Sequence, residues 1–305
     1  MLSPIILFVY NRPEHTRETL YALENNELAS QSILYIFSDG ESENSTNEIK
    51  NKIKEVRAII KERKWCKQVI IKESKINKGL ANSIIDGVSE IIKQYGKVIV
   101  LEDDLIASRY FLNFMNNALD KYNENQEVYQ ISGFSFPLNN IEPKNSSFFL
   151  PITSTWGWAT WERVWSKVDF DCKDYNILKN NKKLSYRFNF QGSYNYKKMF
   201  IKQIETHKVS SWGIRFYWNA FKDNALILFP DKSLILNNGW DNSGRHNDNY
   251  NIFPVLNWDD KYKILYYPES LIINSHYIKF ITSYIKKRTS KFTKIFYKIK
   301  FLFVK

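Results

Sequence analysis

Short apolar runs alternate with polar, helix-patterned segments through the first hundred residues. The apolar runs lie at residues 4–9, 33–37, 68–71 and 98–101 and are rich in Ile, Val, Leu and Phe. Continuous apolar runs of this length are typical of strands buried on both faces, as in a parallel sheet. The segments between them predict helices, including residues 48–64 and 77–92. Strands that alternate with helices predict an α/β fold with a mainly parallel sheet flanked by helices.

Polar side chains follow each of these strands. They are Arg12 after the first strand, Asp39 after the second, Asn77 after the third, and Glu102, Asp103 and Asp104 after the fourth. In open α/β sheets, ligands bind beyond the carboxyl ends of the strands. Three adjacent acids repel one another unless a cation is nearby, and carboxylate oxygens suit Mg²⁺ or Mn²⁺ that also holds substrate phosphates. A solvated acidic turn is the alternative, but polar residues at every strand end favour a ligand site.

The second half of the chain has a less regular pattern. It predicts a helix at residues 110–122, a strand at 128–133, a helix at 211–224 and short strands at 226–230 and 233–236. Trp158, Trp161 and Trp165 are spaced by three and four residues, which predicts one face of a helix. Residues 171–208 are polar and weakly patterned. They predict a surface insertion, or a lid, with one helix near 194–205.

The composition bounds the class of protein. The chain has 305 residues, of which 44% are hydrophobic and 16% aromatic, enough for one large α/β domain or two small ones. Two Cys residues exclude a disulfide framework and predict a reducing compartment. The sequence shows no signal peptide and no apolar run of membrane-spanning length, so we expect a cytoplasmic protein. Neither a dinucleotide fingerprint nor a Walker A loop follows the first strand.

The positive charge is concentrated at the end of the chain. Residues 277–305 contain eight Lys, one Arg and no acid, out of a net charge of +12 for the whole chain. Apolar residues at helical spacing among these cations predict an amphipathic helix on the anionic inner face of the cell membrane. A helix packed on the domain is the alternative. Nucleic-acid binding is not expected, because nothing in the rest of the chain supports it.

The order of these motifs resembles the nucleotide-binding half of a GT-A glycosyltransferase. The motifs are Tyr10-Asn11-Arg12, Asp39, Asn77-Lys78-Gly79-Leu80 and Glu102-Asp103-Asp104. The acidic triplet is similar to the Asp-X-Asp motif in its Glu-Asp-Asp form, as in the family-2-like and N-acetylglucosaminyltransferase I-like bacterial branch. The resemblance extends to residues 155–161 and 238–246. It implies a GT-A, Rossmann-like domain over residues 1–276, with a nucleotide-binding half (1–105), an acceptor half (106–276) and a basic tail (277–305).

The resemblance also implies an activity and a set of residue roles. The activity is metal-dependent transfer of a hexosyl or N-acetylhexosaminyl group, with inversion, in surface polysaccharide synthesis. The donor is a nucleotide sugar, most often a UDP-sugar, and the acceptor is a glycan or a lipid-linked saccharide. The donor would contact Tyr10, Asn11, Arg12, Asp39 through the base, Lys78, Asn82, Glu102 and Asp103. Asp104 and His246 would hold Mn²⁺ or Mg²⁺, and the acceptor would contact Trp156, Gly157, Trp158 and Trp212.

The general base is less clearly marked. The branch places an acid in the segment that matches residues 210–215, and this chain has no carboxylate there. Asp241, Glu205 and Glu162 are the available substitutes, and Asp241 ranks first because of its position in a polar loop. The four His residues have no metal-site spacing, and only His246 is given a functional role. Two alternatives stay open: an inactive membrane-associated carbohydrate-binding module, and a sugar nucleotidyltransferase, which usually has a Gly-rich phosphate loop.

Overall fold

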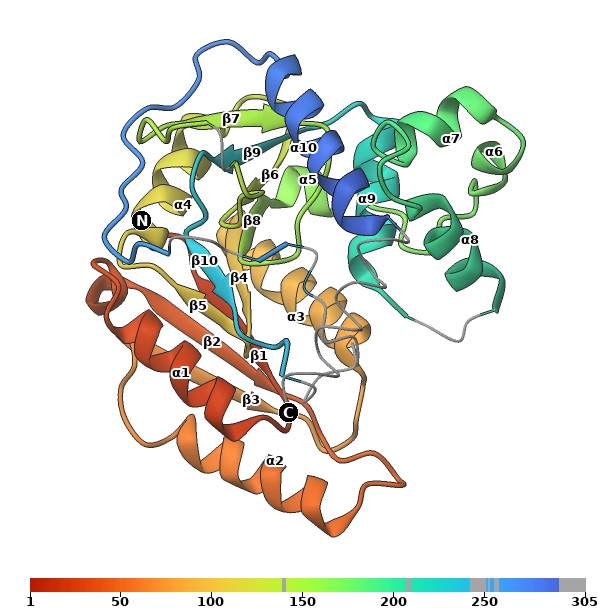
Figure 1. Ribbon diagram of the computed structural model, residues 1–305. Coiled ribbons are helices and arrows are strands. Elements are labelled where there is room, and N and C mark those ends of the chain that lie inside the picture. Colours follow the sequence, from red (N-terminus) through yellow and green to blue (C-terminus); the bar gives the residue numbers. More distant parts are fainter. Residues whose placement is uncertain (139–140, 207–209, 242–250, 252, 255–257, 291–305) are drawn as a thin grey trace, which may run out of the picture.

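The fold is built around an eight-stranded sheet with helices on both faces (Figure 1). The computed structural model describes residues 1–138, 141–206, 210–241, 251, 253–254 and 258–290. The strands stand in the order β3-β2-β1-β4-β8-β6-β9-β7. Their bounds are β1 (Ile5–Val9), β2 (Ile33–Ser38), β3 (Gln68–Glu73), β4 (Lys97–Glu102), β6 (Val128–Ser132), β7 (Ser147–Leu150), β8 (Trp158–Trp161) and β9 (Leu226–Pro230). The predicted α/β class with a mainly parallel sheet is confirmed.

The predicted nucleotide-binding half supplies four neighbouring parallel strands of this sheet. β3, β2, β1 and β4 are mutually parallel. β8 runs antiparallel to both of its neighbours, β4 and β6, while β9 is parallel to β6 and β7 antiparallel to β9. Every residue of β1 is buried, as are residues 98–101 of β4. The continuous apolar runs are explained by this burial, since helices cover both faces of parallel strands.

The helices up to residue 121 include the three crossovers between the parallel strands. They are α1 (Pro13–Glu24), η1 (Ala29–Gln31), α2 (Asn47–Ile59), α3 (Leu80–Tyr95) and α4 (Phe111–Lys121), of which α1, α2 and α3 are the crossovers. α1 and α2 pack side by side, whereas α3 packs against β1 and β4. Because crossovers are right-handed and the strand order turns back after β3, α3 covers the face opposite α1 and α2. β5 (Leu105–Ala107) directly follows β4, packs close to α1 and forms a small antiparallel pair with β10 (Ile235–Asn237) from the second half of the chain.

The tryptophan-rich segment differs from its prediction. Residues 158–161 form strand β8, and a single helical turn, α5 (Glu162–Trp165), follows. β8 pairs with β4 on one side and β6 on the other, and this sheet environment overrides the helical spacing of the tryptophans. Trp158 still stacks with Trp165, at 5.6 Å between ring centroids, because α5 folds back onto the strand. The segment is therefore a buried central strand and not an aromatic helix.

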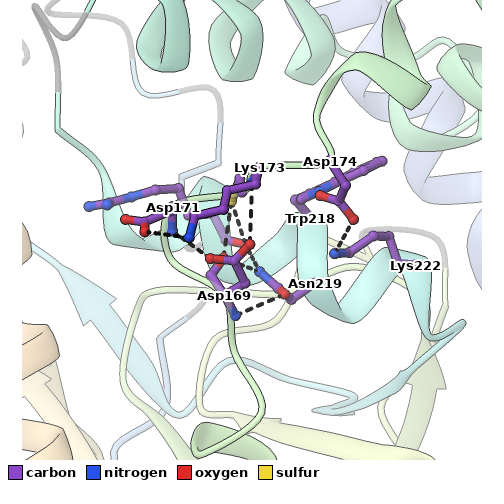
Figure 2. A network of polar contacts seen from close by, with 9 residues as sticks. Asp169, Asp171, Lys173, Asp174, Trp218, Asn219 and Lys222 are labelled. Carbon is purple, nitrogen blue, oxygen red and sulfur yellow. Dashed lines mark hydrogen bonds and ion pairs between the residues drawn. The ribbon is translucent and has the colours of Figure 1, made fainter.

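The polar segment after α5 is a packed helical insertion. It contains α6 (Asn176–Lys179), α7 (Lys182–Phe188) and α8 (Tyr196–Thr206) and leads into α9 (Trp212–Lys222). α8 matches the one helix that was predicted, while α6 and α7 were not predicted. Figure 2 shows how the chain before α6 is fixed to α9: the Asp174 carboxylate accepts a hydrogen bond from Trp218 Nε1 at 2.7 Å and pairs with Lys222 Nζ at 2.6 Å. Phe188 of α7 and Phe200 of α8 also pack against Trp218 of α9.

The last described helix, α10 (Ser275–Thr289), packs on the domain through its apolar face. Ile278, Ile281 and Ile285 are buried, and the Tyr277 ring stacks on Phe148 with 4.0 Å between centroids. These residues belong to a second hydrophobic core, which also contains Phe148, Trp218 and Phe229. Residue 277 is therefore not the start of a free tail, and the first part of the predicted tail matches the alternative of a helix packed on the domain. Residues 291–305 of that tail lie outside the described residues. Within the described part of the chain, no helix is long and apolar enough to cross a membrane.

The burial of α10 gives a direct stability prediction. Ile281→Ala should lower the free energy of unfolding by about 2–5 kcal/mol, because it removes a fully buried side chain and leaves a cavity. Urea denaturation followed by circular dichroism would measure the change. Lys279→Ala, at an exposed position of the same helix, is the matched control and should have little effect. Equal stability of the two variants would mean that α10 is not docked in solution.

Candidate functional site

The strand order reverses between β1 and β4. From β1 the chain moves outward to β2 and β3, and it then returns to the other side of β1 as β4. In open α/β sheets this switch point is where ligands bind, beyond the carboxyl ends of the strands. Phe8 lies opposite Glu102 in the β1–β4 register, so the residues after both strands leave the sheet side by side. Tyr10 and Asn11, both half-exposed, lead from β1 into Arg12.

Arg12 connects the end of β1 to the acids after β4. Its Nη1 lies 2.9 Å from Asp104 Oδ2, and its Nη2 is paired with Asp103 Oδ1. Thr19, nearly two turns into α1, donates a hydrogen bond from Oγ1 to the Asp103 carbonyl at 2.8 Å. One guanidinium therefore bridges two adjacent carboxylates. We call Arg12, Glu102, Asp103 and Asp104 the acid cluster.

The acid cluster holds more negative charge than Arg12 neutralises. Burial, reinforced by the charges of Asp104 and Asp103, raises the pKa of Glu102 well above its usual range. Burial also raises the pKa of Asp103, although the Arg12 charge opposes this shift. Both pKa shifts have the same physical origin: burial removes water from the carboxylate and disfavours its charged form unless a cation is close by. The site therefore favours either a bound proton or an additional positive ion.

The donor atoms of the cluster fit a hard divalent cation. Mg²⁺ is commonly bound by one or two carboxylates, with substrate phosphates and water as the other ligands. Asp104 gives Oδ2 to Arg12, and its Oδ1 has no hydrogen-bond partner among the described residues. No group of three His, Cys, Asp or Glu side chains within the described ranges is arranged to hold a metal ion. A cation at Asp104 would thus depend on phosphate and water ligands. His246, the predicted second ligand, lies outside the described residues.

A segment from the second half of the chain closes over the acid cluster. β10 pairs with β5 so that Asn237 lies opposite Leu105, one residue after Asp104. The Asn238 N–H then donates to the Asp104 carbonyl at 3.1 Å, and its side-chain amide donates to Glu18 of α1. The pairing of β5 with β10 therefore brings residues 237–241 to the switch point.

His15 and Asp241 meet at the edge of this segment. The His15 Nε2 lies 3.3 Å from Asp241 Oδ2 and 3.3 Å from the Asn238 carbonyl oxygen. The His15 side chain is 13% exposed and that of Asp241 is 49% exposed. Sequence reasoning missed His15, because a lone His on a helix carries no sign of its partner. The signal that could have found it is its position in the first turn after Arg12.

Gly239 fits against the acid cluster with no room for a side chain. A Cβ atom at this position would lie 2.3 Å from Asp104 Oδ2 and 3.1 Å from Arg12 Nη1. We predict that Gly239→Ala pushes the Asp104 carboxylate out of place. The expected result is donor affinity at least about tenfold weaker with an unchanged melting temperature, measured by calorimetric titration and thermal unfolding. The control is Gly96→Ala, a C-cap glycine at the amino end of β4. It should lower the melting temperature and leave affinity unchanged.

Asp39 organises the loop that precedes α3. Its Oδ1 accepts hydrogen bonds from the N–H groups of Gly40 and Lys78, both at 2.9 Å, and its Oδ2 accepts from Gly79 at 3.0 Å. The Lys78 ammonium lies 2.8 Å from Asp86 of α3, and the Asn82 amide donates to the Lys78 carbonyl. In this structure the predicted base-binding acid holds its own loop. Its contact with a base stays a prediction.

The residues predicted to bind an acceptor fall into two groups. Trp156 is half-buried, with its ring centroid 6.4 Å from that of Trp240 in the closing segment. Trp158 and Trp212 are both buried and stack on each other at 4.7 Å. Gly157, at φ 60°, is buried against β10. Trp156 is thus near the switch point, while Trp158 and Trp212 are core residues with almost no exposed surface.

The three carboxylates considered as a general base lie in different places. Glu162 follows β8, and its N–H donates to the Gly96 carbonyl at the amino end of β4. This position is at the edge of the sheet opposite the acid cluster. Glu205 forms an ion pair with Lys179 within the helical insertion. Asp241 lies in the segment that closes over the acid cluster, so the structure separates Glu162 and Glu205 from the site and brings Asp241 to it.

Comparisons with known proteins give distant similarities of fold. No protein-family model and no curated protein matches the chain. A crystal structure of S. aureus TarS is 12% identical with a TM-score of 0.40, and it aligns with 77% of this chain. UDP-glucose pyrophosphorylase complexed with UDP-glucose is 13% identical (TM-score 0.37; 77% of this chain, 93% of that one), and an active-site mutant of LgtC is 11% identical (TM-score 0.35; 71% and 69%). The chain spans 36% of the length of the TarS structure. Similarities of this degree do not assign a family or a substrate.

Proposed function

We propose that the protein is a glycosyltransferase that takes a sugar from a nucleotide-sugar donor, of the UDP type, and passes it to a glycan or a lipid-linked saccharide. The observation that carries the proposal is the acid cluster at the switch point between β1 and β4, closed by a segment that brings Asp241. A nucleotide fits a crevice at this place in an α/β sheet. A diphosphate leaving group requires positive charge, and an acid cluster with excess negative charge recruits it.

In this proposal Asp104 holds a divalent cation, Mn²⁺ or Mg²⁺, and His246 stays a predicted second ligand. A cation there would stabilise the negative charge that develops on the departing diphosphate. Glu102 and Asp103 would contact hydroxyl groups of the sugar and ribose. Because Arg12 pairs with the Asp103 carboxylate and the Thr19 hydroxyl holds the backbone carbonyl of the same residue, Asp103 is positioned before a donor binds.

The nucleoside would lie beside the loop that Asp39 organises. A carboxylate has about four acceptor positions, and three are used by N–H groups of this loop, so one is left for a base N–H. Tyr10 and Asn11 are half-exposed beside it and would line the same pocket. Lys78 would have to leave Asp86 to approach a phosphate.

Asp241 is the proposed general base, and inversion at the sugar is part of the proposal. An inverting transfer needs a base at the attacking hydroxyl. About half of the Asp241 side chain is exposed, and His15 fixes the position of one of its oxygens. The half-buried Trp156 ring next to Trp240 would support the acceptor sugar near this base.

A lipid-linked acceptor would place the enzyme at a membrane. The supporting observation is the basic sequence that continues after α10, with Lys291, Lys294, Lys298, Lys300 and Lys305 and no acid. Basic residues close to an anionic surface each contribute about 1 kcal/mol of attraction. We therefore propose a peripheral protein on the cytoplasmic face of the cell membrane.

A nucleotide-sugar panel tests the proposed function. Thermal unfolding of the full chain is measured with each donor, with and without Mn²⁺. One nucleotide sugar should raise the free energy of unfolding by about 2.7 kcal/mol at 100 times its dissociation constant, and only when the metal is present. That donor should also be hydrolysed slowly to the free nucleoside diphosphate.

The two alternatives predict different outcomes in the same experiment. A carbohydrate-binding module would be stabilised by free saccharides and would release no nucleoside diphosphate. A nucleotidyltransferase would release pyrophosphate from a nucleoside triphosphate and a sugar phosphate. Either result would overturn the assignment as a glycosyltransferase.

A further inference from the structure

Positive charge gathers on one side of the molecule, away from α1 and α2. Helices α6–α8 stand together there, and α10 runs along α9 next to them (Figure 1). Among residues 176–206, which span α6 to α8, and residues 275–289 of α10, eleven are basic and Glu205 is the one acid. The basic residues are Lys179, Lys182, Lys183, Arg187, Lys197, Lys198, Lys202, Lys279, Lys286, Lys287 and Arg288. This excess of basic over acidic residues distinguishes the region from the rest of the domain, where acidic and basic residues are mixed.

Several of these lysines, four of them exposed on α7 and α8, have no ion-pair partner among the described residues. Lys182 and Lys183 on α7 and Lys198 and Lys202 on α8 are all exposed. In contrast, the nearby Lys179 is neutralised by Glu205. Lys198 and Lys202 are four residues apart and therefore lie on one face of α8. Concentrated positive charge of this kind is stabilised by an anionic partner.

Apolar side chains are exposed among the free lysines. Tyr186 is 55% exposed and Met199 is 41% exposed. Tyr186 is three and four residues from Lys183 and Lys182, so the three share a face of α7. The Tyr186 ring also lies against Gly192, which borders the same cavity as Met199. Basic residues interspersed with exposed aromatic and aliphatic side chains are typical of surfaces that lie at the membrane interface.

An open cavity of about 660 Å³ lies between the α7–α8 connection and the end of α10. Its lining includes Ser193, Asn195, Lys198, Lys202 and Thr289. This volume is within the range of small-ligand sites. The two free lysines border it, and Asn195 adds an amide. Its chemistry suits a phosphate group more than a neutral sugar.

We propose that the surface formed by α7, α8 and the end of α10 docks on an anionic phospholipid bilayer, with a headgroup phosphate bound between Lys198 and Lys202. Tyr186 and Met199 enter the headgroup region beside it. This surface, which we call the insertion face, is separate from the acid cluster and does not require residues 291–305. The proposal therefore stands or falls independently of the catalytic assignment.

Vesicle co-sedimentation of the full chain tests the insertion face. The protein should sediment with vesicles of phosphatidylcholine and phosphatidylglycerol and not with phosphatidylcholine alone. Lys198→Gln/Lys202→Gln should reduce the partition coefficient by about 30-fold, since two lysines close to the surface are lost. The matched control is Lys54→Gln/Lys93→Gln, which removes the same charge from exposed positions of α2 and α3. It should reduce binding by no more than about threefold.

Further variants separate the contributions to binding. Tyr186→Ser/Met199→Ser should weaken partitioning by about tenfold at unchanged net charge. A chain that ends at Ser290 should keep binding that still depends on Lys198 and Lys202. Unchanged melting temperatures show that each variant is folded, since all the substituted side chains are exposed.

Three results would overturn the proposal. The first is a Lys198→Gln/Lys202→Gln variant that sediments like the wild type. The second is an equal loss in the control, which would indicate attraction by net charge alone. The third is stabilisation of the wild type by inorganic phosphate, dependent on Lys198 and Lys202, without any effect of these lysines on vesicle binding. That result would assign the cavity to a soluble phosphate compound.

Discussion

Asp104→Asn should abolish metal-dependent binding of the donor and lower the transfer rate by about a thousandfold. The substitution keeps the size of the side chain but removes the charge that would hold the cation, and metal stabilisation of a leaving diphosphate contributes several kcal/mol. The fold should persist, because 17% of the Asp104 side chain is exposed and Arg12 retains its pair with Asp103. Steady-state transfer and calorimetric titration with Mn²⁺ would measure both effects.

Asp120→Asn is the matched control for this prediction. Asp120 lies on α4, is exposed and pairs with Lys97, so its loss should leave donor binding unchanged. The assignment of Asp104 fails if the Asp104→Asn variant binds a nucleotide sugar with the same Mn²⁺ dependence as the wild type. A drop in melting temperature alone would instead mean that the Arg12–Asp104 pair is structural.

The first half of the fold could be predicted because its information is local. The apolar runs around Ile5–Val9 and Lys97–Glu102 are long enough to specify buried strands, and each is followed at once by the polar residues that define the site. A parallel sheet brings the carboxyl ends of its strands to one edge, so Arg12 and Asp104 had to be neighbours. Their ion pair follows from the topology and needs no long-range information beyond it.

The second half could not be predicted in the same way because its information is not local. The spacing of Trp158 and its neighbouring tryptophans predicts one face of a helix. In the structure, β4 and β6 pair with this segment on either side and hold it as a strand. From the sequence, Ile281 belongs to an apolar stripe that was predicted to face a membrane. The structure shows that this stripe is buried against Phe148 and its neighbours. Residue propensities and the spacing of apolar residues are properties of one segment. The element that packs against this segment comes from another part of the chain, so local signals do not reveal it.

The pairing of Asp241 with His15 is the most distant of these contacts. It links α1 to a segment more than two hundred residues later, and it depends on the antiparallel pairing of β10 with β5. Nothing near His15 in the sequence indicates that a carboxylate will approach it. The polar loop around Asp241 was therefore enough to suggest this residue as a candidate base. It was not enough to identify His15 as the residue that holds the Asp241 carboxylate in position.

Asp241→Asn should lower the turnover number by about 10² to 10⁴ while leaving donor affinity within a factor of about two. A positioned general base contributes this much to a transfer, and the amide cannot accept the acceptor proton. His15→Asn should have a smaller effect of the same kind, since His15 positions the carboxylate and does not take the proton. Comparing the turnover number with the donor dissociation constant separates loss of the base from loss of the closing segment.

Glu162→Gln and Glu205→Gln are the controls, because both carboxylates lie away from the acid cluster. Each should keep nearly full turnover. The double variant His15→Asn/Asp241→Asn should be no slower than Asp241→Asn alone, because a residue that acts through another adds nothing once its partner is lost. Additive losses would contradict the positioning role of His15. An Asp241→Asn variant with normal turnover would show that a different group accepts the proton.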